Sequence, residues 1–225
     1  MKQHPLLVTR LGHRRSVAPR LHGVRYGRRA IPNRAITSSV RCETKTVGLV
    51  WITGVSGTGK STVRVELATR GYQSFDTDED GIAVWRRRTT GAEVYDPGDG
   101  NHPDTWLQDH CWTINRPRVE QLARMARDEV VFLCGSVENE DEVWELFDIV
   151  ICLVLDESTL RERLAGRTTN QFGKAPGELD VILGWNRTIE ATYQGFGAVV
   201  VNADQALTDV VDEILANLGA ESPNT

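Results

Sequence analysis

The fold is decided by residues 54–62, which read Gly54-Val55-Ser56-Gly57-Thr58-Gly59-Lys60-Ser61-Thr62 and fit the pattern G-x-x-x-x-G-K-[ST]. An apolar run precedes them at residues 47–53, as a strand buried on both faces requires. Residues 61–70 have the pattern of a helix that Gly71 ends. The stretch is therefore predicted to be a phosphate-binding loop, or P-loop, between a strand and a helix.

Each part of a P-loop has a chemical task, and together these tasks predict a nucleotide site over residues 54–62. The glycines let backbone N–H groups turn toward phosphate oxygens, and the N-terminus of the following helix adds positive potential. Lys60 is expected to reach the β and γ phosphates, and Ser61 to ligate Mg²⁺. ATP and Mg²⁺ are thus the expected ligands.

Charge is divided unevenly along the 225 residues, whose formal net charge is −5. Residues 1–45 hold 11 Lys and Arg and a single acidic residue, Glu43. The remaining residues hold 15 Lys and Arg against 30 Asp and Glu, a formal charge of −15. The negative charge of the residues after 45 argues against nucleic acid as a binding partner.

Cysteine usage and hydropathy indicate the compartment. The four cysteines form no C-x-x-C pair, which favours a reducing compartment and no structural metal. No apolar run approaches the length of a membrane span, so we expect a soluble cytoplasmic protein with no membrane partner, either a monomer or a homodimer.

The basic segment 1–45 shows no sustained periodicity and is expected to be a disordered extension. Two other interpretations stay open: a transit peptide for the mitochondrial matrix, and a flexible arm that binds nucleic acid or anionic lipid. Residues 46–219 are expected to form one domain, and 220–225 a short tail.

Four more strands are predicted after the first: a short one at residues 72–75, and apolar runs at residues 130–134, 149–155 and 198–201. Residues 82–88 are expected to start a helix that ends near Gly91, and residues 92–104 to form a loop that covers a site. Strands that alternate with helices predict an α/β fold of three layers, with helices on both faces of a five-stranded parallel sheet.

Two carboxylates in D-x-D spacing, Asp76 and Asp78, come directly after the second strand. Ligands of open parallel sheets bind at the carboxyl ends of strands, so both are well placed. One can hold Mg²⁺, and the other can take a proton from an attacking hydroxyl group. The third strand ends in Cys134 without an acidic residue, which assigns the Mg²⁺ role to Asp76.

Basic residues follow the fourth strand. Arg163, Arg167 and Lys174 flank an interrupted helix and are spaced as a lid that could close over ATP and neutralise charge on the transferred phosphoryl group. Arg116, in an aromatic and basic segment, is a candidate for holding the acceptor.

These motifs in this order resemble the shikimate kinase and gluconate kinase group of the nucleoside-monophosphate-kinase-like fold, over residues 47–218. The resemblance implies strand order 2-3-1-4-5, ATP on the P-loop, and an acceptor between Asp78, the segment 85–118 and Gly135. It implies that Arg167 lies near adenine, Lys174 near the phosphates, and the Asn202 turn beside the adenine. The chain also resembles a family of small ATP-binding proteins.

Two departures bear on the acceptor. Shikimate kinases carry three glycines where this chain has Cys134-Gly135-Ser136, and an arginine where it has Glu190, three residues before Tyr193. That arginine holds the acceptor's carboxylate, so shikimate is expected only if Arg187 replaces it.

The sequence therefore predicts a kinase that transfers the γ-phosphoryl group of MgATP to a hydroxyl group of a small metabolite. Nucleosides, sugars, sugar acids and hydroxylated antibiotics all fit. Two alternatives stay open: a nucleotide-hydrolysing regulatory protein without an acceptor, and a polynucleotide kinase that uses the basic arm.

Overall fold

Strand β1 (Leu49–Thr53) lies at the centre of the sheet and is buried over its whole length, as its apolar run predicts. The computed structural model describes residues 48–95, 106–168, 172–174 and 177–219, with only the backbone at 106 and 107. The chain clusters into two units, Met1–Glu43 and Thr44–Thr225, and the described residues all belong to the second. The expected flanking segments, 1–45 and 220–225, lie outside the described residues.

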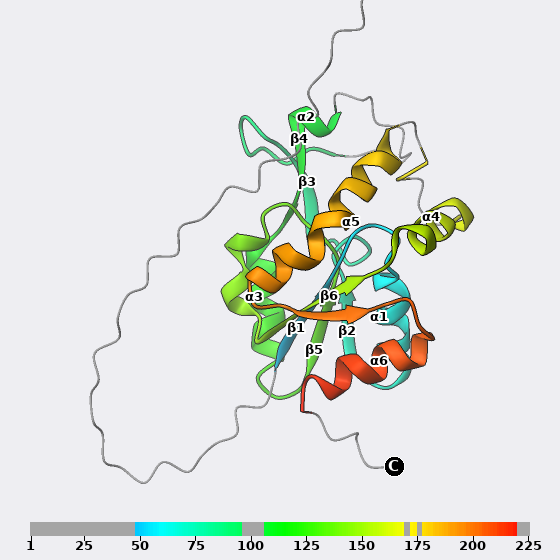
Figure 1. The fold of residues 1–225 in the computed structure, drawn as a ribbon. Helices are drawn as coiled ribbons and strands as arrows, with labels where there is room; N and C mark the ends of the chain where they lie inside the picture. The colour runs from blue at the N-terminus through cyan, green and yellow to red at the C-terminus, as the bar shows by residue number, and fades with distance from the viewer. Residues whose placement is uncertain (1–47, 96–105, 169–171, 175–176, 220–225) are drawn as a thin grey trace, which may run out of the picture. The chain divides into compact units, whose positions relative to one another are not determined.

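Five parallel strands form the central sheet in the order β2-β5-β1-β6-β7 (Figure 1). The other four strands are β2 (Gln73–Asp76), β5 (Val131–Cys134), β6 (Ile149–Val154) and β7 (Val199–Asn202). Counted along this sheet alone, the order is 2-3-1-4-5, so the predicted topology is confirmed. Asp76 pairs in register with Cys134, and Ile52 pairs with the same residue from the other side. The P-loop and Asp76 therefore emerge at the same edge of the sheet.

Alternate residues of β1 enter two separate cores, which makes the molecule three-layered. Val50 and Ile52 pack with residues of α1 (Lys60–Thr69), α4 (Glu157–Gly166) and α6 (Leu207–Ala216). Leu49 and Trp51 pack on the other face with α3 (Arg116–Met125) and the segment of two 3₁₀ turns, η1 (Glu140–Glu142) and η2 (Trp144–Leu146). Helix α5 (Glu178–Gly195) reaches both cores.

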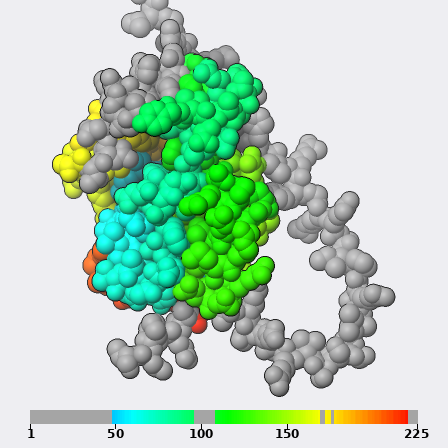
Figure 2. All heavy atoms as spheres, turned by 180° about the vertical axis from the view of Figure 1, so that it is seen from behind, coloured from blue at the N-terminus to red at the C-terminus, as the bar shows by residue number. Residues whose placement is uncertain are grey.

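The helix expected at residues 82–88 was wrong, because this segment is strand β3 (Ala83–Arg87). It pairs antiparallel with β4 (His110–Ile114), which follows the short helix α2 (Trp106–Asp109). Val84 and Trp85 are good strand formers, and cross-strand pairing with partners 29 and 27 residues away is a tertiary contact that local periodicity does not reveal. Seen from behind, the blue-green atoms of this hairpin lie above the cyan of α1 and β2 and the green of α3 (Figure 2).

Within the described part of the chain, no helix is both long and apolar enough to cross a membrane.

Candidate active site

The P-loop has the backbone that its glycines predict. Gly54, Gly57 and Gly59 all have positive φ angles, and at Gly54 a side chain would also collide with the Leu153 carbonyl oxygen, which lies 2.6 Å from an ideal Cβ position. The buried Thr58 closes the loop, since its N–H and its hydroxyl both donate to the Val55 carbonyl, at 3.3 and 3.0 Å. Thr62 lies exposed in the first turn of α1.

Lys60 folds back over the loop and donates to the carbonyls of Gly54 and Val55, at 2.8 and 3.0 Å. Burial lowers the pKa of Lys60 to about 8, although Asp78 and Asp76 act in the opposite direction. A cation with two replaceable carbonyl partners fits a site for phosphate oxygens, which would make stronger, charge-assisted hydrogen bonds.

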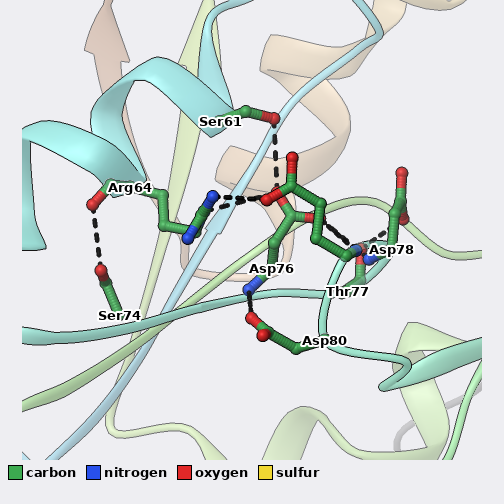
Figure 3. A network of polar contacts seen from close by, with 8 residues as sticks. Ser61, Arg64, Ser74, Asp76, Thr77, Asp78 and Asp80 are labelled. Atoms are coloured by element: carbon green, nitrogen blue, oxygen red, sulfur yellow. Dashed lines mark hydrogen bonds and ion pairs between the residues drawn. The ribbon is translucent and has the colours of Figure 1, made fainter. Parts of the chain in front are cut away.

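Ser61 and Asp76 come together, as the sequence predicts, because α1 begins beside the end of β2 (Figure 3). The Ser61 hydroxyl donates to Asp76 Oδ2 at 3.3 Å. Asp76 is buried, and its Oδ1 accepts the N–H groups of Asp78 and Glu79, at 2.8 and 3.3 Å. Asp80 Oδ2 accepts the backbone N–H of Asp76 at 2.7 Å, so the turn after β2 fixes the backbone of Asp76 as well as its carboxylate.

A hydroxyl and a carboxylate oxygen are ligands that suit Mg²⁺. No group of three or more His, Cys, Asp or Glu residues that could hold a metal is found where the structure describes the chain. The pair therefore fits an ion that takes its remaining ligands from nucleotide phosphates and water, as Mg²⁺ does in such sites.

The carboxylate of Asp78 has other partners than the Ser61–Asp76 pair. Its Oδ1 accepts the Thr77 hydroxyl at 2.8 Å and the Trp112 indole N–H at 3.2 Å. Burial raises the pKa of Asp78, whereas these hydrogen bonds and the charge of Lys60 lower it. The two carboxylates of the D-x-D motif thus have different partners and can perform different tasks.

Gly135 has a packing role in the structure. A Cβ at this position would lie 1.9 Å from the Thr77 hydroxyl oxygen. The N–H of Gly135 donates to the Ile52 carbonyl, and its own carbonyl accepts the Trp51 indole N–H. Both backbone groups are thus engaged within the protein, and the contact with substrate implied by the resemblance stays a prediction.

The lid is described only in part, since residues 169–171 and 175–176 lie outside the described residues. Arg167 donates to the Ser56 hydroxyl at 3.1 Å and to the Phe172 carbonyl, which brings the lid to the P-loop. Burial lowers the pKa of Arg167. Lys174 is exposed.

Arg116 and Arg187 are not brought to Asp78. Arg116 pairs with Glu120 at 3.0 Å and Glu145 at 2.5 Å. Arg187 is exposed and pairs with Glu157 at 3.0 Å. Neither contact supports the expected role of these arginines in holding an acceptor.

In the turn after β7, Asn202 is exposed and its side chain accepts the N–H of Asp204 at 2.9 Å. Arg163 connects this turn to the P-loop, because it donates to the carbonyls of Thr58 at 3.4 Å and Ala203 at 2.9 Å. The sequence placed Arg163 in the lid, and its spacing gave no sign of this bridge.

The contacts of two residues near the P-loop and Asp78 were not predicted. Ser136 donates to the Gly54 carbonyl at 2.6 Å, and its place directly after a strand end could have suggested it. Trp112 bonds to Asp78 across 34 positions, and only a correct prediction of the hairpin could have found it.

A family model described as "AAA domain" matches residues 50–183, more than half of the chain. The shikimate kinase from Acinetobacter baumannii in complex with shikimate is 16% identical, over 77% of this chain and 93% of that one, with a TM-score of 0.51. The shikimate kinase from Bacteroides thetaiotaomicron is 14% identical, over 77% and 99%, with a TM-score of 0.50. These two similarities establish a shared fold, as the sequence resemblance implies.

A gluconokinase from Sinorhizobium meliloti 1021 is 24% identical, over 77% of this chain and 93% of that one, with a TM-score of 0.45. No significant match was found among curated proteins.

Proposed function

This chain belongs to the AAA domain family, and on that premise we propose that it is an ATP-dependent kinase that transfers the γ-phosphoryl group to a hydroxyl group of a small metabolite. The observation that carries the proposal is the separation of two carboxylates. Asp76 faces Ser61, whereas Asp78 is held by Thr77 and Trp112. A nucleotide switch needs the first carboxylate for its metal but has no evident use for the second.

The residues of the P-loop bind and orient the donor. Its amide groups and Lys60 stabilise negative charge on the phosphates, and Ser61 and Asp76 would hold Mg²⁺. When bound, Mg²⁺ neutralises charge on the phosphate oxygens. Arg167 and Lys174 would close the lid and exclude water.

Asp78 serves the acceptor. The hydroxyl oxygen of the acceptor bonds to the γ-phosphorus, the bond from that phosphorus to the bridging oxygen of ADP breaks, and the hydroxyl proton passes to Asp78. Phosphoryl transfer depends mainly on position and electrostatics, so this small set of residues is sufficient.

The proposal is tested by ADP release from MgATP with pooled sugars, sugar acids and nucleosides, for wild type, Lys60→Ala and Asp78→Asn. We expect one pool to stimulate ADP release by wild type. In both variants this stimulated rate should fall at least about tenfold, which corresponds to about 1.4 kcal/mol of transition-state stabilisation. If no pool stimulates, and Asp78→Asn hydrolyses ATP like wild type, a regulatory ATPase without an acceptor replaces the kinase.

We also propose a cytoplasmic protein, monomeric or dimeric, whose activity does not need residues 1–45. Truncation after Lys45 separates this from the other interpretations of the basic segment. Unchanged activity supports a dispensable extension. Loss of strongly salt-dependent nucleic-acid binding would instead support a polynucleotide kinase with a basic arm, and loss of mitochondrial import a transit peptide.

A further inference from the structure

Trp112 of β4 connects the hairpin to two strand ends. Its indole N–H donates to Asp78, which follows β2. Its backbone N–H donates to Glu138 Oε1 at 3.3 Å, and its carbonyl accepts the N–H of Glu138 at 2.9 Å. Glu138 follows β5, the neighbour of β2 in the sheet. Trp112 is thus fixed between the two strand ends that flank the acceptor side of the site.

The Trp112 ring is also held independently of Asp78. Trp85 lies directly opposite in the β3–β4 register, and the two ring centroids are 5.3 Å apart. Aromatic cross-strand pairs of this kind stabilise hairpins and restrict both rings. The indole N–H is therefore in position before any acceptor binds, which is how supporting residues orient a reactive group.

The contacts of Asp78 are asymmetric. Thr77 and Trp112 both donate to Oδ1, and among the residues that the structure describes none donates to Oδ2. Rotation of the carboxylate would break both hydrogen bonds. Oδ2 is thus left as the oxygen that can receive a proton from a hydroxyl group.

We propose that Trp112 is a positioning residue, whose indole N–H fixes the Asp78 carboxylate so that Oδ2 faces the acceptor hydroxyl. The inference rests on the proposed kinase function and adds a residue to it. Trp112 acts through Asp78, and the effect of losing its N–H should fall on kcat more than on the KM for ATP, because ATP binds to the P-loop.

The hydrogen bond is tested without any acceptor, by ¹H–¹⁵N NMR of the six indole groups of the full chain. Trp112→Phe assigns the Trp112 resonance by its loss. In Asp78→Ala that resonance should move upfield while the other five keep their positions, which also reports that the variant is folded. Glu79→Ala, the exposed neighbouring carboxylate, is the control and should leave it unchanged. If the Trp112 resonance keeps its position in Asp78→Ala, the inference is overturned.

The positioning role is tested by acceptor-dependent ADP release, with D-glucose, D-gluconate, shikimate and adenosine as the first acceptors and the wider pools after them. Trp112→Phe keeps a ring against Trp85 but has no N–H, so kcat should fall about tenfold while the KM for MgATP stays within about twofold. Trp185→Phe, an exposed tryptophan of α5, should match wild type.

The outcomes separate the two proposals. If wild type uses an acceptor and Trp112→Phe has the same kcat, the positioning role is overturned and the kinase stands. If wild type shows no acceptor-dependent turnover, the kinase proposal fails and the positioning role fails with it, even where the NMR response is present.

Discussion

The Tyr193 hydroxyl donates to Glu140 Oε2 at 2.5 Å and lies 3.5 Å from the Thr53 hydroxyl. This contact joins α5 to η1 and to the last residue of β1, directly before the P-loop. Burial raises the pKa of Glu140 to about 7, although the hydrogen bond from Tyr193 acts in the opposite direction. Burial also raises the pKa of Tyr193, so the phenol remains the donor.

Glu140 is therefore predicted to make the protein less stable as pH rises. Its pKa is higher in the folded state than its ordinary value of 4.5, so the folded state binds more protons between these values. The stability that protonated Glu140 contributes is present below about pH 4.5 and is lost as pH rises through about 7. We expect a loss of about 1–3 kcal/mol between pH 5 and 8, allowing for partial exposure.

The measurement is urea unfolding at pH 5 and pH 8 for wild type and Glu140→Gln. Glutamine keeps an acceptor for Tyr193 but does not titrate, so the pH dependence of the variant should be smaller by this amount. Glu145→Gln, an exposed carboxylate in η2, is the control. If wild type and Glu140→Gln lose the same free energy of unfolding over this range, Glu140 does not titrate there.

Asp76→Asn is predicted to weaken the dependence on Mg²⁺. Asparagine can still accept the N–H groups of Asp78 and Glu79, so the turn should survive, but the charge beside Ser61 is lost. We expect the Mg²⁺ concentration for half-maximal ATP turnover to rise about tenfold, equivalent to about 1.4 kcal/mol. Glu79→Gln removes an exposed charge that pairs with Arg64 and should have little effect. Equal Mg²⁺ curves for wild type and Asp76→Asn would assign the ion to other ligands.

The parallel sheet could be predicted from the sequence because four of its five strands are short apolar runs, and the P-loop indicates where the first strand ends. Ser61 and Asp76 could be paired in advance, since strand ends of a parallel sheet meet at one edge. The hairpin could not. Its residues mix Trp and Arg without a clear period, and the hydrogen bond from Trp112 to Asp78 is set by tertiary pairing.

The direction of the arginine side chains is a second feature that the sequence does not reveal. Sequence gives the charge of Arg116, Arg163 and Arg187 but not the direction of a long, flexible side chain. Arg116 and Arg187 bind glutamates of neighbouring elements, whereas Arg163 binds backbone carbonyls at the nucleotide side.

Gly135→Ala is predicted to destabilise the protein by about 2–4 kcal/mol, because its methyl group would overlap the Thr77 side chain in a well-packed region. Gly166→Ala is the matched control, since a Cβ there meets nothing within 4 Å and alanine favours the helix. Urea unfolding should show a clear loss for the first variant and no loss, or a small gain, for the second. A Gly135→Ala variant as stable as wild type would show that Thr77 can move aside at little cost.

Arg163→Met is predicted to weaken ATP binding and stability together. The guanidinium of Arg163 holds the Thr58 carbonyl of the P-loop and the Ala203 carbonyl of the turn after β7. Methionine keeps much of the aliphatic packing but leaves both carbonyls without this donor, at a cost of about 1–3 kcal/mol. We expect the KM for ATP to rise about five- to tenfold with a smaller change in kcat, because the bridge shapes the binding site and does not touch the acceptor side.

The control is Arg161→Met on the same helix, whose exposed pair with Glu157 contributes about 0.3–0.5 kcal/mol. Similar losses in both variants would mean that helix charge, and not the bridge, is responsible.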